Sequence, residues 1–585
     1  MVSAAAYNPP GDHASEFING TDERPGALRK LGFTGLESYN YASDAPGGGL
    51  RPDADADRHP DTVAYTFGHR AVTVGGAEMT LVAAVVRGTS GNHEWLSNFD
   101  MGEGEGDDHR GFARAKDRVL DRLTEYMAAN GLYGRDDVMV WVTGHSRGAA
   151  VANLLAAGLV GGEGPVGKGK VFAYTFATPN VTQNPAAGGA AAYGYIHNLI
   201  NAEDFIAYMP LAEWGFGRYG VSYAYPGGFL VDDPGEYLSA VGGAYLTMTG
   251  FPAKAGGNGY PDLYAGLIAP IAELIPTRAD YYGKAIISSA TQGLTAAEFF
   301  GGVAGLMSGG TPSRGQLAAY MLGFSRIVPF FVSMDGQSVR FNDRVGTAHN
   351  PAMYVALTKP LGSGWEPVRD VSAFFVRVEG PADIEVLTGE GGMAGRVLGG
   401  EVDAPSIGGI AVYPDGDGFL LALPAGGGHS VRLAGAGRGR LSVAVWEVAR
   451  LTGPMNPIKS FANVSVTEGK ALWLTLGPVA DGGAVSPGGS GSDGPDDPGV
   501  GDAGGSGGDA ARAADPRLYV TVGGEVRLEV ASDGREVAYE RGPGGGVYGD
   551  VDGWIIPAVA VPTAALAVLA AMRVRVRVRK AKKRI

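Results

Sequence analysis

The feature that most constrains the fold of this chain is the pentapeptide Gly-His-Ser-Arg-Gly at residues 144–148. A strand-like apolar run at 138–143 precedes it, and a helix-like run at 149–159 follows it. A serine between two glycines at such a junction predicts a sharp strand-to-helix turn, because side chains at the glycine positions would clash with the strand and the helix. The turn would strain the backbone of Ser146, expose its hydroxyl and place it at a helix N-terminus, which favours negative charge.

The surrounding sequence is needed to interpret this pentapeptide. With 97 glycines among 585 residues, the pattern Gly-x-Ser-x-Gly is expected about once by chance. It recurs at 504–508, in a tract rich in Gly, Asp and Ser that has no strand signal before it and no helix signal after it. Ser146 is therefore the predicted nucleophile, and Ser506 is interpreted as the chance match.

Composition indicates a globular protein with an acidic body. Apolar residues make up 45% of the chain and charged residues 18%, and the length allows about two or three domains. The chain has no cysteine, which excludes disulfides and thiolate metal sites. The net charge is -14 although residues 573–585 carry eight Arg or Lys and no acid, so the preceding part is more acidic still. Such a body is a poor candidate for binding nucleic acid.

Residues 1–360 are predicted to form an α/β domain with a mostly parallel sheet. Between residue 60 and about residue 210, strand and helix signals alternate as such a sheet requires. An amphipathic helix with Val119 and Leu123 on its apolar stripe lies between the second and third strands. Residues 211–348 form a long insertion, whose apolar runs fit either core helices or a cap over a cleft. The predicted strands are 63–67, 80–86, 138–143, 171–176 and 195–200, and the apolar runs of the insertion are 294–307 and 317–332.

The following part of the chain consists of short β-like runs separated by Gly, Pro and Asp. Residues 365–478 are predicted to form a small all-β, sandwich-like domain. A flexible Gly/Asp/Ser-rich linker at 479–515 and a short β-prone stalk at 516–550 come next. The β-like runs of the sandwich are 374–378, 384–387, 410–413, 419–423, 441–448 and 472–476.

Residues 554–572 are predicted to be a transmembrane helix. These nineteen residues carry no charge, and as a helix they would span about 28 Å, close to the thickness of a bilayer core. The basic tail 573–585 would then be cytoplasmic and the body extracellular, at the cell surface. The alternative is an alanine-rich soluble helix containing Pro557 and Pro562. Residues 1–7 lack the basic start and apolar stretch of a signal peptide, so the true start would lie upstream or the signal is not recognisable.

A serine nucleophile requires a histidine base and an acid that orients the base. In the α/β-hydrolase fold the acid and then the histidine follow the serine, which leaves His197, His349 and His429. His197 lies inside a strand-like run and His429 lies in the β-rich region, so His349, in a polar loop, is the predicted base. The predicted acid is Asp204, which follows the run 195–200, although aspartate is also common as a turn or cap residue.

Two backbone donors for a developing oxyanion are expected beside the serine. One is the amide of Arg147, the residue after the nucleophile. The other comes from the turn at 87–89, where Thr89 could donate both its amide and its hydroxyl. The same Arg-Gly-Thr sequence fits equally well a plain turn at the end of the strand 80–86.

Four sequence blocks follow one another in a fixed order. They are Val-Val-Arg-Gly-Thr at 85–89 with Glu-Trp-Leu-Ser-Asn-Phe-Asp at 94–100, Thr-Gly-His-Ser-Arg-Gly-Ala-Ala at 143–150, Tyr-Thr-Phe-Ala-Thr-Pro at 174–179, and Asn-Ala-Glu-Asp-Phe at 201–205. In this combination the chain resembles the class 3 (fungal lipase-like) lipase family over residues 60–360. The resemblance implies an α/β-hydrolase fold, a triad of Ser146, Asp204 and His349, an oxyanion contribution from Thr89, and a lid near residues 90–98.

The chain departs from this family at three points, the first being that the β-rich domain and the predicted anchor are not part of the core family pattern. The residue after the serine is usually leucine in the family and is Arg147 here, whose cation close to the cleft could alter substrate choice or pair with a nearby carboxylate. The separation of 145 residues between Asp204 and His349 is longer than usual.

The resemblance implies a lipase-like carboxylic ester hydrolase that acts on acylglycerol-like lipid esters through an acyl-enzyme. Such chemistry needs no metal and no organic cofactor. The expected partners are a lipid or other acyl-ester substrate and a membrane, without nucleic acid. Two alternatives stay open, namely an inactive hydrolase-fold protein that binds or adheres at the cell surface, and an acyltransferase or phospholipase using the same triad.

Overall fold

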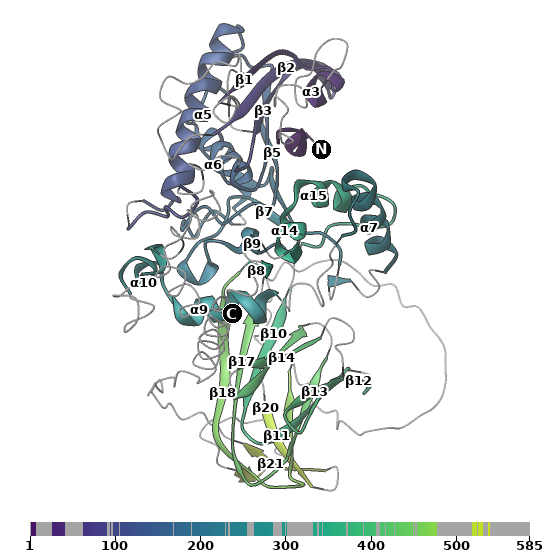
Figure 1. The fold of residues 1–585 in the computed structure, drawn as a ribbon. Helices are drawn as coiled ribbons and strands as arrows, with labels where there is room; N and C mark the ends of the chain where they lie inside the picture. Colours follow the sequence, from purple (N-terminus) through teal and green to yellow (C-terminus); the bar gives the residue numbers. More distant parts are fainter. Residues whose placement is uncertain are drawn as a thin grey trace, which may run out of the picture.

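In the computed structural model, the chain forms one region built on a mostly parallel sheet and a second region of antiparallel sheets, with short helices between them (Figure 1). The structure describes residues 2–7, 26–40, 63–89, 94, 97–104, 106–167, 169–188, 190–227, 230–231, 235–253, 263–284, 295–298, 300, 332–335, 338–341, 343–369, 372–389, 391–404, 410–415, 417–425, 428–448, 450, 453–476, 517–522, 525–530 and 536–538.

The first sheet contains seven strands that lie side by side in chain order. Strands β3 to β7 are parallel, whereas β1, β2 and β3 pair antiparallel, so the sheet is not parallel throughout. The five predicted strands correspond to β2 through β6. The seventh strand, at residues 221–224, lies inside the predicted insertion 211–348, so the insertion begins after this strand and not at residue 211. The strand was not predicted because a run of four residues among Gly and Tyr is too short to give a clear strand signal. The strands are β1 (Thr34–Tyr39), β2 (Tyr65–Val74), β3 (Ala77–Val86), β4 (Val138–His145), β5 (Val171–Phe176), β6 (Ile196–Ile200) and β7 (Val221–Ala224).

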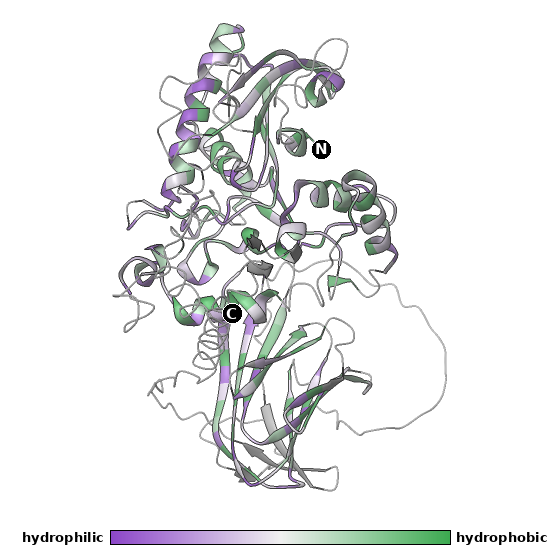
Figure 2. Cartoon of the chain, viewed as in Figure 1, coloured by the Kyte–Doolittle hydropathy of each residue, from purple (hydrophilic) through white to green (hydrophobic). Residues whose placement is uncertain are grey.

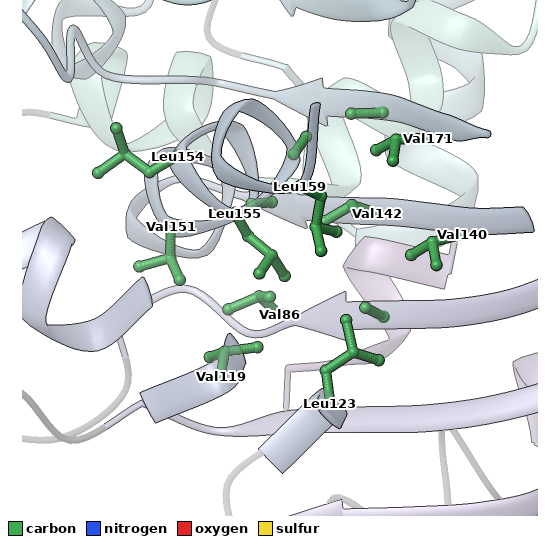
Figure 3. Packing of buried hydrophobic residues seen from close by; sticks show 14 of the residues in the cluster. Val86, Val119, Leu123, Val140, Val142, Val151, Leu154, Leu155, Leu159 and Val171 are labelled. Atoms are coloured by element: carbon green, nitrogen blue, oxygen red, sulfur yellow. The ribbon is translucent and has the colours of Figure 1, made fainter. Parts of the chain in front are cut away.

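Two long helices cover one face of this sheet. They are α5 (Arg110–Ala129), the predicted amphipathic helix, and α6 (Arg147–Gly161), which follows the Gly-His-Ser-Arg-Gly turn. Hydrophilic and hydrophobic residues alternate along α5, as its partly exposed position requires (Figure 2). Side chains from β3, β4 and β5 interdigitate with both helices in one core, in which Figure 3 labels Val86, Val119, Leu123, Val140, Val142, Val151, Leu154, Leu155, Leu159 and Val171.

The opposite face is covered by segments that are distant in sequence. Because successive strand residues point to opposite sides, Ala83 and Val85 of β3 face away from α6. They pack against α1 (Val2–Ala5) and the segment that contains α3 (Ala27–Lys30). Farther along the sheet, α7 (Gly235–Thr249) and α15 (Pro351–Thr358) pack against each other in a core with Ala177 and Tyr225.

The described part of the insertion consists of short elements. They include η5 (Ala212–Trp214), η7 (Tyr264–Ile268), α9 (Ala269–Leu274), α10 (Arg278–Gly283), the hairpin β8 (Val332–Asp335) and β9 (Ser338–Phe341), and α14 (Asp343–His349). Two further short helices, η3 (Ala191–Tyr193) and η4 (Phe205–Tyr208), flank β6. The predicted apolar runs 294–307 and 317–332 lie almost entirely outside the described residues, and so does most of the lid predicted near 90–98.

The second region contains two antiparallel sheets around a common apolar core. One sheet has the order β14-β15-β10-β17-β18, and the other begins β13-β12-β11-β16-β19. The second sheet continues into β20 and β21, because residues 517–522 pair with β19 and thus extend the sheet rather than stand apart as a stalk. The strands are β10 (Ala373–Glu379), β11 (Ala382–Leu387), β12 (Met393–Leu398), β13 (Glu401–Ala404), β14 (Ala411–Asp415), β15 (Gly418–Pro424), β16 (Ser430–Gly435), β17 (Gly439–Val448), β18 (Met455–Val466), β19 (Ala471–Thr475), β20 (Arg517–Val522), β21 (Glu525–Val530) and β22 (Glu536–Ala538).

Strand β10 links this region to the rest of the molecule. Its residues Phe374 and Val376 enter the core between the two antiparallel sheets. Its residue Phe375 points the other way and packs on Tyr264 of the insertion, with ring centroids 4.8 Å apart. The same core reaches Phe205, next to the predicted catalytic acid, so one continuous apolar cluster joins the antiparallel sheets to the end of β6.

The predicted linker 479–515, transmembrane helix 554–572 and basic tail 573–585 all lie outside the described residues. Among the residues that are described, no helix combines the length and apolar character needed to cross a membrane.

Candidate active site

The strand-to-helix turn at Ser146 has the strained geometry that its sequence predicts. Ser146 adopts φ 60° and ψ −131°, a sparsely populated conformation for a residue with a side chain. A Cβ added to Gly144 would lie 2.2 Å from the carbonyl oxygen of Gly148, and one added to Gly148 would lie 2.4 Å from that of Val86. Both glycines are therefore required for helix α6 to leave β4 at this angle, with Ser146 at its N-terminus.

The structure brings the three predicted catalytic side chains together. His349 Nε2 lies 2.7 Å from Ser146 Oγ, and His349 Nδ1 lies 2.8 Å and 2.9 Å from the two carboxylate oxygens of Asp204. Because a carboxylate can only accept, Nδ1 carries the proton and Nε2 accepts from the serine hydroxyl. The Asp204 side chain is fully buried and that of His349 is 23% exposed, so the histidine is the member of this pair that solvent reaches.

Asp204 is held by the segment that ends β6 and by the helix after His349. One of its oxygens accepts a hydrogen bond from the amide of Ile206, which makes Asp204 the N-cap of η4. The other accepts a 2.7 Å hydrogen bond from the hydroxyl of Tyr354 in α15. Burial and the neighbouring Asp204 carboxylate raise the pKa of Tyr354 well above its usual value, so the phenol keeps its proton and remains a donor. The same carboxylate that caps η4 is thus the one that contacts His349, the predicted base.

His349 lies at the C-terminal end of helix α14, not in a loop as predicted. The segment before it, Asp-Arg-Val-Gly-Thr-Ala, contains Gly and Thr, which weaken the helix signal. The end of this helix is tied to β6, because the side-chain amide of Asn201 donates to the carbonyl of Ala348 over 3.0 Å. Asn350 then caps α15 by accepting from the amide of Ala352.

A tyrosine from the start of the described chain also reaches the site. The Tyr7 hydroxyl lies 2.8 Å from Nδ1 of His145 and 3.3 Å from the carbonyl oxygen of the same residue, which precedes Ser146. Burial raises the pKa of Tyr7, which keeps its hydroxyl protonated. Burial and the nearby His349 lower the pKa of His145 well below its usual value, so this imidazole is neutral and can accept from Tyr7.

The two residues expected to serve the oxyanion lie at the ends of neighbouring elements. Thr89 follows β3, and its hydroxyl oxygen accepts a 3.0 Å hydrogen bond from the side-chain amide of Asn98. Arg147 is the first residue of α6, and its guanidinium is buried against Ser97 and Glu94. The cation does not extend into open solvent beside Ser146.

The remaining histidine candidates are not brought to Ser146. His197 lies on β6 with its ring stacked on Tyr174 at 5.0 Å, and His429 is buried just before β16. Sequence reasoning missed Tyr7 and Tyr354. The position of Tyr354 in the apolar run after His349 offered a weak signal for α15, but nothing in the sequence related Tyr7 to a serine 139 residues later.

Residues 83–214 match the model of a family described as lipase (class 3). This segment is class 3 lipase-like. The match includes Thr89, Ser146 and Asp204, while His349 lies beyond it. The lipase-like region therefore carries the α/β-hydrolase type of sheet described above, and the later antiparallel sheets lie outside the matched residues.

Comparison with solved structures finds several fungal lipases. A triacylglyceride lipase of Rhizomucor miehei is 22% identical over 28% of this chain and 62% of its own, with a TM-score of 0.22. A lipase of Rhizopus microsporus var. chinensis is 19% identical over 27% of this chain and 61% of its own, with a TM-score of 0.20. A mono- and diacylglycerol lipase of Aspergillus oryzae is 21% identical over 27% of this chain and 63% of its own, with a TM-score of 0.21. The matched part thus spans about three fifths of each of these chains. A search of the curated proteins finds no match.

Proposed function

We propose that this protein is a lipase-like carboxylic ester hydrolase that acts on acylglycerol-like lipid esters through an acyl-enzyme. The observation that carries the proposal is the chain of contacts from Ser146 through His349 to Asp204, with distances of 2.7 Å and 2.8 Å. A nucleophile within hydrogen-bond reach of a base, itself oriented by a buried acid, is the arrangement that acyl transfer requires. The class 3 lipase match over 83–214 supports the choice of ester substrates.

In the first step, His349 Nε2 removes the hydroxyl proton while Ser146 Oγ attacks the ester carbonyl carbon. The buried carboxylate of Asp204 stabilises the imidazolium that forms. The imidazolium then returns the proton to the departing alcohol, and the acyl group remains on Ser146. Water, deprotonated by the same His349, releases the carboxylic acid in the second step.

The oxyanion of each tetrahedral intermediate is stabilised by the amides of Arg147 and Thr89 and by the Thr89 hydroxyl. The Thr89 oxygen already accepts from Asn98, so its own proton is available to the oxyanion. The N-terminus of α6 adds a favourable dipole at the same place.

The experiment compares the full chain with Ser146→Ala and with Ser506→Ala, the serine of the second Gly-x-Ser-x-Gly pattern. Wild type and Ser506→Ala are expected to react with a fluorophosphonate probe and to hydrolyse a medium-chain chromogenic ester. Ser146→Ala is expected to lose labelling and at least about 10³-fold in turnover. Retained turnover in Ser146→Ala would rule out this mechanism, and a wild type that neither labels nor hydrolyses would favour an inactive surface-binding protein.

The same triad could serve a phospholipase or an acyltransferase. Wild type assayed on triglyceride, phospholipid and simple esters, with and without an acceptor alcohol, distinguishes these activities by their products. Preferred release of fatty acid from acylglycerol supports the proposed substrate class. Preferred release from phospholipid, or ester formation with the alcohol, would replace it.

We also propose that the body is displayed at the cell surface and held by residues 554–572, with 573–585 in the cytoplasm. The support is the uncharged run of nineteen residues followed by eight basic ones. Fractionation of cells that express the full chain should leave the protein in membranes after alkaline carbonate extraction, with the body open to protease added outside. Release by carbonate would contradict the anchor.

A further inference from the structure

Three charged side chains form a buried cluster directly beside the proposed nucleophile. Arg87 Nη2 lies 3.6 Å from Glu94 Oε1, and Arg147 Nη1 lies 3.7 Å from the same oxygen. The side chains of the two arginines are 1% exposed and that of Glu94 is 3% exposed. Charged groups are rarely buried to this extent without ion pairs and hydrogen bonds, so the cluster fixes the relative positions of the segments that carry them.

The cluster joins the three segments that surround the oxyanion. Arg87 follows β3 and precedes Thr89 by two residues, Glu94 belongs to the segment after Thr89, and Arg147 is adjacent to Ser146. The backbones of these segments also meet, because a Cβ on Gly148 would lie 2.7 Å from the carbonyl oxygen of Arg87. No bulkier residue at 148 would allow this approach.

Hydrogen bonds continue from the cluster to Thr89 itself. Arg147 donates from Nη2 and Nε to the hydroxyl oxygen of Ser97 over 2.9 Å and 3.2 Å, and Ser97 donates onward to the carbonyl of Glu94. The next residue, Asn98, donates from its side chain to the hydroxyl oxygen of Thr89. A chain of contacts therefore runs from the residue after the nucleophile to the second proposed oxyanion donor.

The other end of Asn98 is held as well. Its backbone carbonyl lies 3.2 Å from Nε2 of His109, the N-cap of α5. Burial lowers the pKa of His109 to about 3, so the ring is neutral. Its Nδ1 accepts from the amide of Phe112, which leaves the proton on Nε2 and makes His109 the donor to Asn98.

We propose that Arg147, Glu94 and Ser97 are positioning residues that hold Thr89 in register with Ser146 for oxyanion binding. This rests on the proposed function of the same site. The side chain of the arginine that replaces the leucine usual in the class 3 family thus acts through Glu94 and Ser97 and does not contact substrate, because its guanidinium is buried. Oxyanion donors are effective only when the fold already holds them in position before the reaction begins. A shift of Thr89 would therefore weaken binding of the transition state more than binding of the substrate.

The test uses the full chain with three conservative variants. Ser97→Ala removes the hydroxyl that accepts from Arg147. Glu94→Gln removes the negative charge and keeps the side-chain shape. Arg147→Lys keeps the positive charge and removes the planar guanidinium with its paired N–H donors. Arg122→Ala, which breaks the exposed 2.6 Å ion pair with Glu125 on α5, is the control. Active sites are counted by the end point of fluorophosphonate labelling, so that turnover refers only to folded enzyme.

The measured quantities are kcat and KM for an ester and for the corresponding thionoester, in which sulfur replaces the carbonyl oxygen and accepts hydrogen bonds poorly. In Ser97→Ala and Glu94→Gln we expect kcat to fall about 10- to 100-fold with KM changed less than about threefold. The ratio of ester to thionoester turnover should fall as well, since the oxyanion donors contribute less.

The outcomes separate this inference from the proposed function. An inert, unlabelled wild type would refute the proposed function, and the inference with it. A labelled, active wild type whose variants keep wild-type turnover for each labelled site would overturn the inference alone. A loss of turnover with an unchanged ester-to-thionoester ratio would also overturn it, because the cluster would then act on something other than the oxyanion. Ser97→Ala leaves the buried charges of the cluster unchanged. If Glu94→Gln does not fold, the result for Ser97→Ala therefore tests the inference.

Discussion

The hydroxyl of Tyr7 occupies a space that no side chain at position 88 could share. A Cβ on Gly88 would lie 1.8 Å from this oxygen and 2.6 Å from the carbonyl oxygen of His145. Tyr7 therefore fills the gap between the oxyanion turn and the nucleophile turn. Its aromatic ring packs edge-on against His145, with ring centroids 5.4 Å apart. The segment 2–7 thus contributes a side chain to the site.

Replacing Tyr7 by Phe should impair both stability and turnover. The variant keeps the ring but leaves His145, a buried imidazole, without its 2.8 Å partner. We expect the free energy of unfolding to fall by about 1–3 kcal/mol. We expect kcat to fall about three- to tenfold, because the Tyr7 hydroxyl also contacts the carbonyl oxygen of His145, the residue before Ser146. Denaturant titration and kcat per labelled site measure the two effects, and Tyr133→Phe, an exposed tyrosine, is the control. Unchanged values for Tyr7→Phe would contradict the role.

At the scale of single residues, sequence could predict what depends on local geometry. The glycines around Ser146 predict a sharp turn there. Chain order reduced nine histidines to three, and the local sequence around each of these three favoured His349. Tyr7 and Tyr354 could not be found in this way, since their contacts with His145 and Asp204 depend on tertiary packing between distant segments. A carboxylate partner for Arg147 could be suggested from sequence, but neither its identity as Glu94 nor the burial of the pair could be, because an arginine in sequence usually indicates an exposed charge.

At the scale of elements, the N-terminus of α5 combines a cap with a buried titratable group. His109 is fully buried, stacks on Phe112 with ring centroids 3.8 Å apart, and holds Asn98. Its folded-state pKa of about 3 lies well below the ordinary value of 6.5. Below pH 6.5 the unfolded chain binds a proton at this histidine and the folded chain does not, so the free energy of unfolding decreases as pH falls toward 3.

Replacement of His109 by Asn should therefore flatten the acid side of the stability profile. Asparagine can cap α5 as well but does not titrate. We expect the decrease in unfolding free energy between pH 6 and pH 4 to be smaller in the variant by about 1.4 kcal/mol per pH unit. Denaturant unfolding at pH 7, 6, 5 and 4 gives both profiles. Parallel profiles would show that His109 is charged in the folded protein. His145, whose pKa is also lowered by burial, contributes a slope of the same sign to both proteins.

Elements with strong, regular patterns were predicted more completely than weak ones. Strand β5 begins and ends where expected, and β4 continues only two residues beyond the predicted run. The missed strands include β1, β7, β12, β13, β16 and β18. Their apolar residues are interspersed with small, polar or charged ones, and these segments become strands only by pairing with neighbours. The two antiparallel pairings at the start of the first sheet were missed for a similar reason, since strand signals do not reveal direction.

At the scale of the whole molecule, the two regions share an apolar core. The sheet that contains β10 is covered on one face by the other antiparallel sheet and on the opposite face by the insertion. Polar contacts reinforce this second interface. Glu213 accepts from the hydroxyl of Tyr264 and from the amide of Met455, and Arg377 pairs with Glu273 over 3.1 Å. The sequence suggested a separate β domain, because composition changes near residue 365 but says nothing about which faces are buried.

Because the core is shared, we expect a loss of packing in strand β10 to lower the thermal stability of the proposed active site as well. Phe375 is fully buried on the insertion side of β10, whereas Leu433 of β16 is equally buried in the core between the antiparallel sheets. Each change to Ala should cost about 2–5 kcal/mol locally. Only Phe375→Ala removes packing from the cluster that contains Phe205, beside Asp204. We therefore expect Phe375→Ala to lower the temperature at which esterase activity is lost by several degrees more than Leu433→Ala does. If both variants are destabilised in calorimetry and lose esterase activity at the same temperature, the packing between β10 and the insertion does not specifically stabilise the active site.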